Sequence, residues 1–199
     1  MKDINYPINL VFNIGTIAND FSATDANNKT IAYVKQKLFK LKEDVLVYSD
    51  ENKSQINYTI KADRWIDFSA AYSIKDERTK KEIGKIARKG WRSLWKAEYD
   101  IIDQHQKPQY KIKEKSALTR VLDSLFGEIP ILSFFTGYLF NPTYLVTDNY
   151  NNVIVEMKKE PSFFGRKFSI SKNRDIDQDD QERVILSLMM MVLLERRRG

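Results

Sequence analysis

Apolar and polar residues alternate along most of the chain, as in strands that bury one face. Between Gln55 and Ile66, for example, Tyr58 and Ile60 alternate with Thr59 and Lys61. Segments of this kind predict about twelve strands: Ile8 to Ile14, Asp20 to Asp25, Thr30 to Lys40, Val45 to Ser49, Gln55 to Trp65, Asp67 to Ile74, Glu82 to Arg92, Lys96 to Ile102, Pro108 to Lys115, Tyr144 to Asp148, Val153 to Glu160, and Arg166 to Lys172.

The predicted inward face is not uniform along these strands. Ile56, Tyr58, Ile60 and Ala62 are expected on one face of a single strand. In Thr30 to Lys40 and in Glu82 to Arg92 the alternation slips part-way, which indicates β-bulges, and Gly84 and Gly90 suit such positions.

Polar turns led by aspartate separate the strands. They begin at Asp25, Asp50, Asp76, Asp103 and Asp148, and the first four lie 25, 26 and 27 residues apart. This spacing predicts a repeated two-stranded unit, and therefore a meander of hairpins. A meander of this length either closes into a barrel or leaves an exposed edge, and closure removes the edge.

The C-terminal stretch predicts a helix of another kind. Every residue from Val184 to Leu194 except Ser187 is apolar, so a helix here has no polar face and must be buried on all sides. Eleven residues span roughly 16 Å, about half of a hydrocarbon layer of roughly 30 Å, so no transmembrane span is predicted. A barrel of more than eight strands needs a central filler. The sequence therefore predicts a mainly β fold, a closed antiparallel barrel of about twelve strands around this buried C-terminal α-helix.

One insertion interrupts the meander late in the chain. Ser116 to Gly127 predicts a short helix, with a serine at its start and a glycine at its end. The uncharged, apolar segment Ile129 to Phe140 follows. We interpret this segment as a plug on the barrel mouth; the alternative is an exposed apolar patch that dips into lipid or holds a partner.

Composition narrows the function further. The 199 residues contain no flexible linker, so we expect a single domain over residues 1–199. Cysteine is absent, which excludes disulfides, thiol catalysis and cysteine-ligated zinc, and fits a cytoplasmic protein, either free or peripheral to a membrane. The formal net charge of +6 and a pI near 9.3 favour phosphates or an anionic lipid surface, although most charges are expected on a solvated surface.

No catalytic residue and no cofactor is predicted. The single histidine, His105, lies in the polar turn DQHQKP, where a solvated turn residue is expected. The chain has no G-x-S-x-G elbow, no P-loop and no dinucleotide fingerprint. The sequence neither predicts nor excludes a catalytic pair of carboxylates, because 27 acidic residues make chance pairs inevitable.

Basic residues cluster in two stretches. The first, KIARKGWRSLWK, interleaves cations with Trp91 and Trp95, and the second runs from Lys158 to Lys172. Cations with nearby aromatic rings suit a membrane surface or, less favoured here, single-stranded nucleic acid. The alternative is a set of outward-facing lysines that prevent edge pairing. The candidate anion-binding residues are Lys85, Arg88, Lys89, Arg92, Lys96, Arg166 and Lys167.

The chain resembles a known family in three stretches. They are IAYVKQKLFKLKEDVLVYSDENK, IGKIARKGWRSLWKAEYDIID, and FFGRKFSIS followed by ERVILSLMMMVLLE. With the hairpin meander and the buried terminal helix, these resemble the tubby C-terminal-like superfamily, in its branch of LURP-one-related and phospholipid scramblase proteins. The resemblance implies a closed barrel around the helix. It also implies lipid headgroup binding through basic residues on the barrel surface, although no position here matches the tubby headgroup site residue by residue.

The same resemblance implies a calcium site as one candidate, because scramblases are proposed to bind calcium just before the final helix. An EF-hand loop counted from Asp175 would place Asp180 where glycine is required and Leu186 where glutamate is required. We therefore interpret the acidic run as helix capping. A weak calcium site of another type at Asp175, Asp177 and Asp179 is the alternative.

Together these patterns predict a non-enzymatic binding module. Its expected ligand is an anionic, phosphoinositide-like lipid headgroup or a partner protein at a basic outer barrel face. The alternatives are a nucleic-acid-binding protein, or a ligand-free scaffold that associates through Ile129 to Phe140.

Overall fold

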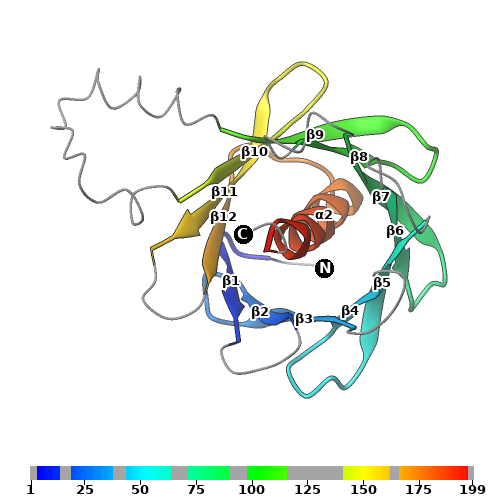
Figure 1. The fold of residues 1–199 in the computed structure, drawn as a ribbon, viewed down its shortest axis with the longest axis vertical. Coiled ribbons are helices and arrows are strands. Elements are labelled where there is room, and N and C mark those ends of the chain that lie inside the picture. The colour runs from blue at the N-terminus through cyan, green and yellow to red at the C-terminus, as the bar shows by residue number, and fades with distance from the viewer. Residues whose placement is uncertain are drawn as a thin grey trace, which may run out of the picture.

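The computed structural model describes residues 4–13, 19–37, 44–63, 71–89, 98–115, 141–161 and 166–196. Twelve strands precede one long helix in this part of the chain (Figure 1). The elements are β1 (Ile8–Phe12), β2 (Asp20–Thr24), β3 (Thr30–Gln36), β4 (Asp44–Tyr48), β5 (Ile56–Ala62), β6 (Ala71–Asp76), β7 (Glu82–Arg88), β8 (Glu98–Ile102), β9 (Pro108–Glu114), β10 (Thr143–Thr147), β11 (Val153–Glu160), β12 (Lys167–Lys172) and α2 (Gln178–Arg196).

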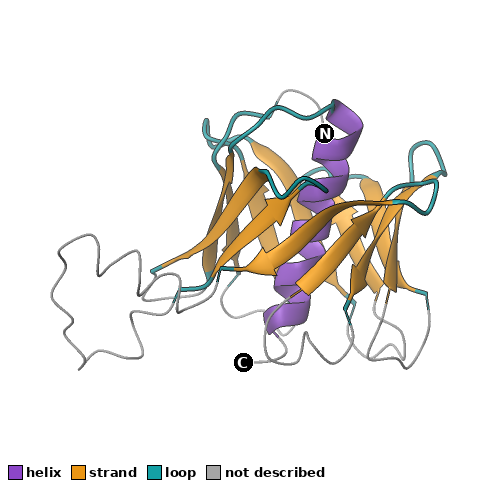
Figure 2. Cartoon of the chain, turned by 90° about the horizontal axis from the view of Figure 1, so that it is seen from above, coloured by secondary structure: helices purple, strands orange, loops and turns teal. Residues whose placement is uncertain are grey.

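The strands form one closed antiparallel barrel. Each pairs with its neighbours in sequence, and β1 closes the ring by pairing with β12, with Ile8 opposite Ile170. Helix α2 runs through the middle of the ring (Figures 1 and 2). The predicted mainly β barrel around a C-terminal helix is therefore confirmed.

The barrel has two distinct ends. At one, which we call the turn end, lie the five aspartate-led hairpin turns and the start of α2; at the other, the exit end, α2 finishes (Figure 2). The aspartates fix the turns by accepting backbone hydrogen bonds. Asp103 Oδ1, for example, accepts from the backbone N–H of His105 and of Lys107, both at 2.8 Å. His105 is exposed in this turn, as predicted.

A β-bulge follows each of these turns. The pairing register shifts so that one residue near the start of the second strand has no residue opposite it on the preceding strand. The unpaired residues are Ile31, Asn57, Ile83, Gln109 and Ile154. The bulges predicted in the strands that contain Ile31 and Ile83 are thus confirmed, and Gly90 lies outside the described residues.

The predicted orientation of one side chain, Ile56, is wrong because of such a bulge. Ile56 was expected on the inward face with Tyr58, but it pairs with Tyr48 and is 37% exposed, whereas Tyr58 is 1% exposed. The bulge at Asn57 adds one residue between them, and one extra residue moves a side chain to the opposite face.

Helix α2 fills the barrel, as predicted. From Val184 to Leu194 every residue is buried, and Met189, Met190 and Met191 are 0% exposed. Inward residues of the strands, among them Ala23, Ile60 and Ile112, form the surrounding core with it. In the described part of the chain, α2 is not long and apolar enough to cross a membrane. The predicted short helix Ser116 to Gly127 and the apolar segment Ile129 to Phe140 lie outside the described residues.

Candidate ligand-binding pocket at the exit end

The last inward positions of several strands are polar near the exit end. Strand alternation carries Arg88 of β7 into the barrel, opposite the buried Tyr99 of β8. Glu114 of β9 lies opposite Tyr144 of β10, and Lys159 of β11 lies opposite Phe168 of β12. The barrel core is therefore aliphatic in its middle and ends in a layer of charged and aromatic side chains.

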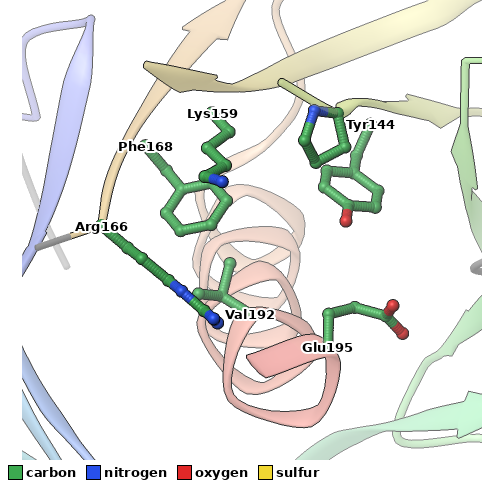
Figure 3. Close-up of a pocket in the computed structure, with 7 residues that line it drawn as sticks. Tyr144, Lys159, Arg166, Phe168, Val192 and Glu195 are labelled. Carbon is green, nitrogen blue, oxygen red and sulfur yellow. The ribbon is translucent and has the colours of Figure 1, made fainter. Parts of the chain in front are cut away.

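A pocket of about 290 Å³ opens in this layer, between α2 and strands β10, β11 and β12. Figure 3 shows its lining side chains around the last turns of the helix. They are Pro142, Tyr144, Lys159, Arg166, Phe168, Val192 and Glu195. The volume is at the lower limit for small-molecule sites, which is enough for a headgroup but not for a whole lipid.

Two cations occupy one side of the pocket. Lys159 comes from β11, and Arg166 stands directly before β12, where its carbonyl accepts the N–H of Phe12 at 3.0 Å. Both side chains are partly buried, and no carboxylate of the described residues forms an ion pair with either. Phe168 and Val192 supply apolar surface beside them. Two like charges held together in a concave, partly apolar site attract an anion.

Tyr144 and Glu195 lie on the other side of the pocket in Figure 3. The buried Tyr99 donates its hydroxyl to Glu195 Oε1 at 2.5 Å, which fixes this carboxyl at the end of α2. Burial raises the pKa of Glu195 above its usual value; the hydrogen bond from Tyr99 and the charge of Arg88 oppose that shift, whereas Glu114 adds to it. The same burial, with the charge of Glu195, raises the pKa of Tyr99.

The structure divides the first predicted basic group between two faces. Lys85 and Lys89 lie outside the barrel, where carboxylates neutralise them: Lys85 pairs with Asp63 at 3.1 Å, and Lys89 pairs with Asp100 at 3.3 Å. Arg88, between them, points inward. Arg92 and Lys96 lie outside the described residues. The described members of this group therefore do not form one basic surface.

The second basic group is also divided. Lys158 and Lys167 are exposed on the outer face, and Lys172 pairs with Asp175 at 2.6 Å. Only Lys159 and Arg166 enter the pocket. The sequence carried a signal for Lys159, which shares the inward register of Val155 and Met157, but our candidate set omitted it. No sequence pattern pointed to Tyr144 or Glu195.

The predicted calcium residues separate in the structure. Asp175 pairs with Lys172, Asp177 Oδ1 accepts the backbone N–H of Asp180 at 2.9 Å, and Asp179 lines a second cavity of about 430 Å³ at the turn end. The bond to Asp177 fits the helix-capping interpretation. Within the described ranges, no three or more histidine, cysteine, aspartate or glutamate side chains are grouped so that they could hold a metal ion.

The cavity at the turn end is the weaker candidate because its buried Arg183 and its carboxylates Asp76 and Glu182 already have charged partners within the protein. Arg78 reaches Asp76 at 2.9 Å and Glu182 at 3.6 Å. Arg183 is bound to Asp180 at 2.5 Å. The exit-end pocket, whose two cations form no ion pair with a carboxylate of the described residues, is therefore the candidate site.

Comparison with known families now adds to the geometry. A family model described as LURP-one-related matches residues 30–189 of the chain. The match runs from β3 into α2 and includes the pocket residues Tyr144, Lys159, Arg166 and Phe168, while Val192 and Glu195 lie beyond it. Neither the curated proteins nor the solved structures gave a match.

Proposed function

Because the chain belongs to the LURP-one-related family of the tubby-like superfamily, we propose that it is a non-enzymatic binding module for the phosphate of an anionic lipid headgroup. The exit-end pocket is the proposed site. The family and the barrel support a binding role in general, and the pocket supplies the chemistry that suits this ligand.

The observation that carries the proposal is the pairing state of the cations. Lys159 and Arg166 face one pocket and have no carboxylate partner among the described residues, whereas Lys85 and Lys89 on the outer face are neutralised. Uncompensated like charges in a partly buried site weaken the fold unless a ligand compensates them. Arginine binds phosphate through two parallel hydrogen bonds, and lysine adds a point charge.

The surroundings of the pocket suit a peripheral membrane site. Lys158 on β11 and Lys167, the first residue of β12, directly neighbour the pocket cations in sequence; both are exposed and lie near the exit end. Each lysine near an anionic surface contributes about 1 kcal/mol of attraction at moderate salt. These outer lysines would draw the exit end toward the bilayer, and the pocket would then take one headgroup.

Co-sedimentation with vesicles tests the proposal. At low salt, the wild-type protein should pellet with vesicles that contain phosphatidylglycerol, and the double variant Lys159→Gln, Arg166→Gln should bind at least about tenfold more weakly, since it loses two charge-assisted contacts. The matched control is Lys29→Gln, Lys107→Gln, which removes the same charge from exposed side chains at the turn end.

The outcomes distinguish binding in the pocket from general attraction between a basic protein and an anionic membrane. Selective loss in the pocket variant supports the proposal. Equal loss in both variants would indicate only general electrostatic attraction, and absence of wild-type binding at low salt would show that the lipid assignment is wrong.

A further inference from the structure

We infer that the pocket selects a terminal phosphate, that is, a phosphate monoester with three free oxygens, over a phosphodiester such as the one in the headgroup of phosphatidylglycerol. This inference rests on the proposed function and specifies its ligand class. It comes from the placement of the two pocket cations and from the number of oxygens that they can bind together.

Lys159 and Arg166 lie on the same inner face of two paired strands. Lys159 of β11 is opposite Phe168 of β12, and Arg166 precedes Phe168 by two residues. Because side chains alternate along a strand, Arg166 shares the face of Phe168 and is the diagonal neighbour of Lys159. Diagonal neighbours lie roughly 7–8 Å apart, within reach of long side chains. Both cations extend from the barrel wall toward the last turns of α2 (Figure 3), so one phosphate between them can contact both.

The donors of these two cations match a phosphate with three free oxygens. Arginine donates two parallel hydrogen bonds to two phosphate oxygens, and the lysine ammonium can donate to the third. A phosphate monoester offers three such oxygens and carries a charge of about −1.5 to −2 at pH 7. A diester has one free oxygen fewer and a single negative charge. With a diester, Lys159 would share an oxygen with Arg166, and about one positive charge would stay uncompensated.

The protein does not supply the missing negative charge itself. Among the described residues that line the pocket, Glu195 is the one carboxylate. Its Oε1 accepts the hydroxyl of Tyr99 at 2.5 Å, and the charge of Arg88 on β7 also acts on it. Lys159 and Arg166 form no ion pair with this or any other carboxylate of the described residues, and both are half-buried. Their two positive charges are therefore left for a ligand.

Two soluble probes test the selectivity without a membrane. Glycerol 3-phosphate is a monoester, and glycerophosphoglycerol is a diester of the same phosphate. In an NMR titration at pH 7.5 and low salt, the wild-type protein should bind glycerol 3-phosphate about three- to tenfold more tightly, the range of one additional, partly screened charge contact. Lys159→Gln should remove this preference, Lys159→Arg should keep it, and Arg166→Gln should weaken the binding of both probes.

Lys113→Gln is the matched control. Lys113 is exposed on β9, where it lies opposite Leu145 of β10, so this variant loses the same charge outside the pocket. The preference for the monoester should be unchanged in it. If the preference survives in Lys159→Gln, or if Lys113→Gln removes it equally, the assignment to the pocket is wrong.

The pH dependence of the wild-type protein tests the same point even if a pocket variant does not fold. The second proton of a phosphate monoester binds with a pKa of about 6, whereas a diester keeps its single charge. Lowering the pH from 7.5 to 5 should therefore remove most of the preference. Protonation of the nearby carboxylates Glu195 and Glu114 would strengthen the binding of both anions, so it cannot produce this loss. A preference that stays constant over this range would contradict the inference.

Vesicles then show whether the phosphate belongs to a lipid. Phosphatidic acid carries a terminal phosphate, and phosphatidylglycerol carries a diester. On vesicles matched in surface potential, the wild-type protein should co-sediment more strongly with phosphatidic acid, and Lys159→Gln should remove the difference.

The outcomes distinguish this inference from the proposed function. Equal or tighter binding of the diester, as probe and as lipid, would overturn the inference while leaving phosphate recognition intact. Failure of both probes and of both kinds of vesicle would overturn both. A preference for the soluble monoester without binding to either vesicle would support the inference and identify a free phosphate monoester, instead of a lipid, as the source. A preference seen only on vesicles and lost in Lys159→Gln would support it with a lipid as the source.

Discussion

Two arginines at opposite ends of the same barrel show how differently the fold treats a positive charge. Arg183, at the turn end, is 3% exposed and hydrogen-bonds the carbonyl of Ile83 at 2.7 Å, Gln109 at 2.5 Å, Asp180 at 2.5 Å and Gln104 at 3.0 Å. Arg166, at the exit end, faces a pocket and has no carboxylate partner among the described residues. Arg183 therefore stabilises the fold, whereas Arg166 is placed to bind a ligand.

Tyrosines repeat this contrast. Tyr110 donates its hydroxyl to Asp180 at 2.6 Å, and Tyr99 donates to Glu195 at 2.5 Å, so each end of α2 is anchored to the barrel through a carboxylate. At the turn end the cation Arg183 binds that same carboxylate. At the exit end, Lys159 and Arg166 form no ion pair with a carboxylate among the described residues. Binding sites commonly keep such uncompensated cations at some cost in stability.

The largest expected effect is the loss of Arg183. Arg183→Ala removes a buried charge from its network and leaves Asp180 without its cation, which should cost about 3–5 kcal/mol of unfolding free energy. For a chain of this size, the melting temperature should fall by roughly 10 °C.

Arg166→Ala is the control at the other end and should change the unfolding free energy by no more than about 0.5 kcal/mol. Thermal unfolding measures both variants. Equal destabilisation would contradict the conclusion that Arg183 stabilises the fold and Arg166 does not.

Gly84 supports Arg183 and should give the next largest effect. Its φ is +149°, and a Cβ atom there would lie 2.4 Å from the carbonyl oxygen of Ile102 and 2.7 Å from Cδ of Arg183. Gly84→Ala should therefore cost about 2 kcal/mol or more, from backbone strain and displacement of the arginine.

Chemical denaturation measures this cost. The double variant Gly84→Ala, Arg183→Ala shows whether the cost arises through Arg183. If the cost arises partly through Arg183, the double variant should be less destabilised than the sum of the single variants. Full additivity would mean that the strain is local to the backbone.

Acid should weaken the turn end by a smaller amount. The hydrogen bond from the Lys107 N–H lowers the pKa of Asp103, and the hydrogen bond from the Asn152 side chain lowers that of Asp148, both below 3.8. A lowered carboxyl pKa contributes stability that is complete above the unfolded value and is lost as the pH falls through the folded value. Stability should therefore decline as the pH drops below 3.8.

Hydrogen exchange locates this loss. Amides of the aspartate turns, such as those of Lys107 and Asn152, should lose protection before the exit-end strand pairs on lowering the pH. Asp103→Asn should reduce the acid sensitivity around its own turn, while earlier loss of protection at the exit end would contradict the assignment.

The strands and the central helix were predictable because their signals are local. Alternation located all twelve strands, and the uninterrupted apolar run from Val184 to Leu194 required a buried helix. The even spacing of the turns also indicated a repeated hairpin. The facing of Ile56 was mispredicted because its turn is followed by a bulge at Asn57, which composition does not mark.

The candidate site was harder to predict because neighbours in sequence do not share a face. Lys158 and Lys159 point to opposite sides of β11, and Arg88 points away from Lys85 and Lys89. A basic run in a strand therefore divides between solvent and barrel interior.

The sequence by itself determined the barrel, its filler and its positive charge, since periodicity and composition act over a few residues at a time. Only the tertiary structure decided which charges are neutralised and which are not. Closure of the ring brings Tyr144, Lys159, Arg166 and Glu195 from separate elements to one pocket, while it pairs Lys85 and Lys89 with carboxylates of neighbouring segments. Charge pairing depends on distances across the barrel, and those distances exist only after the chain has closed.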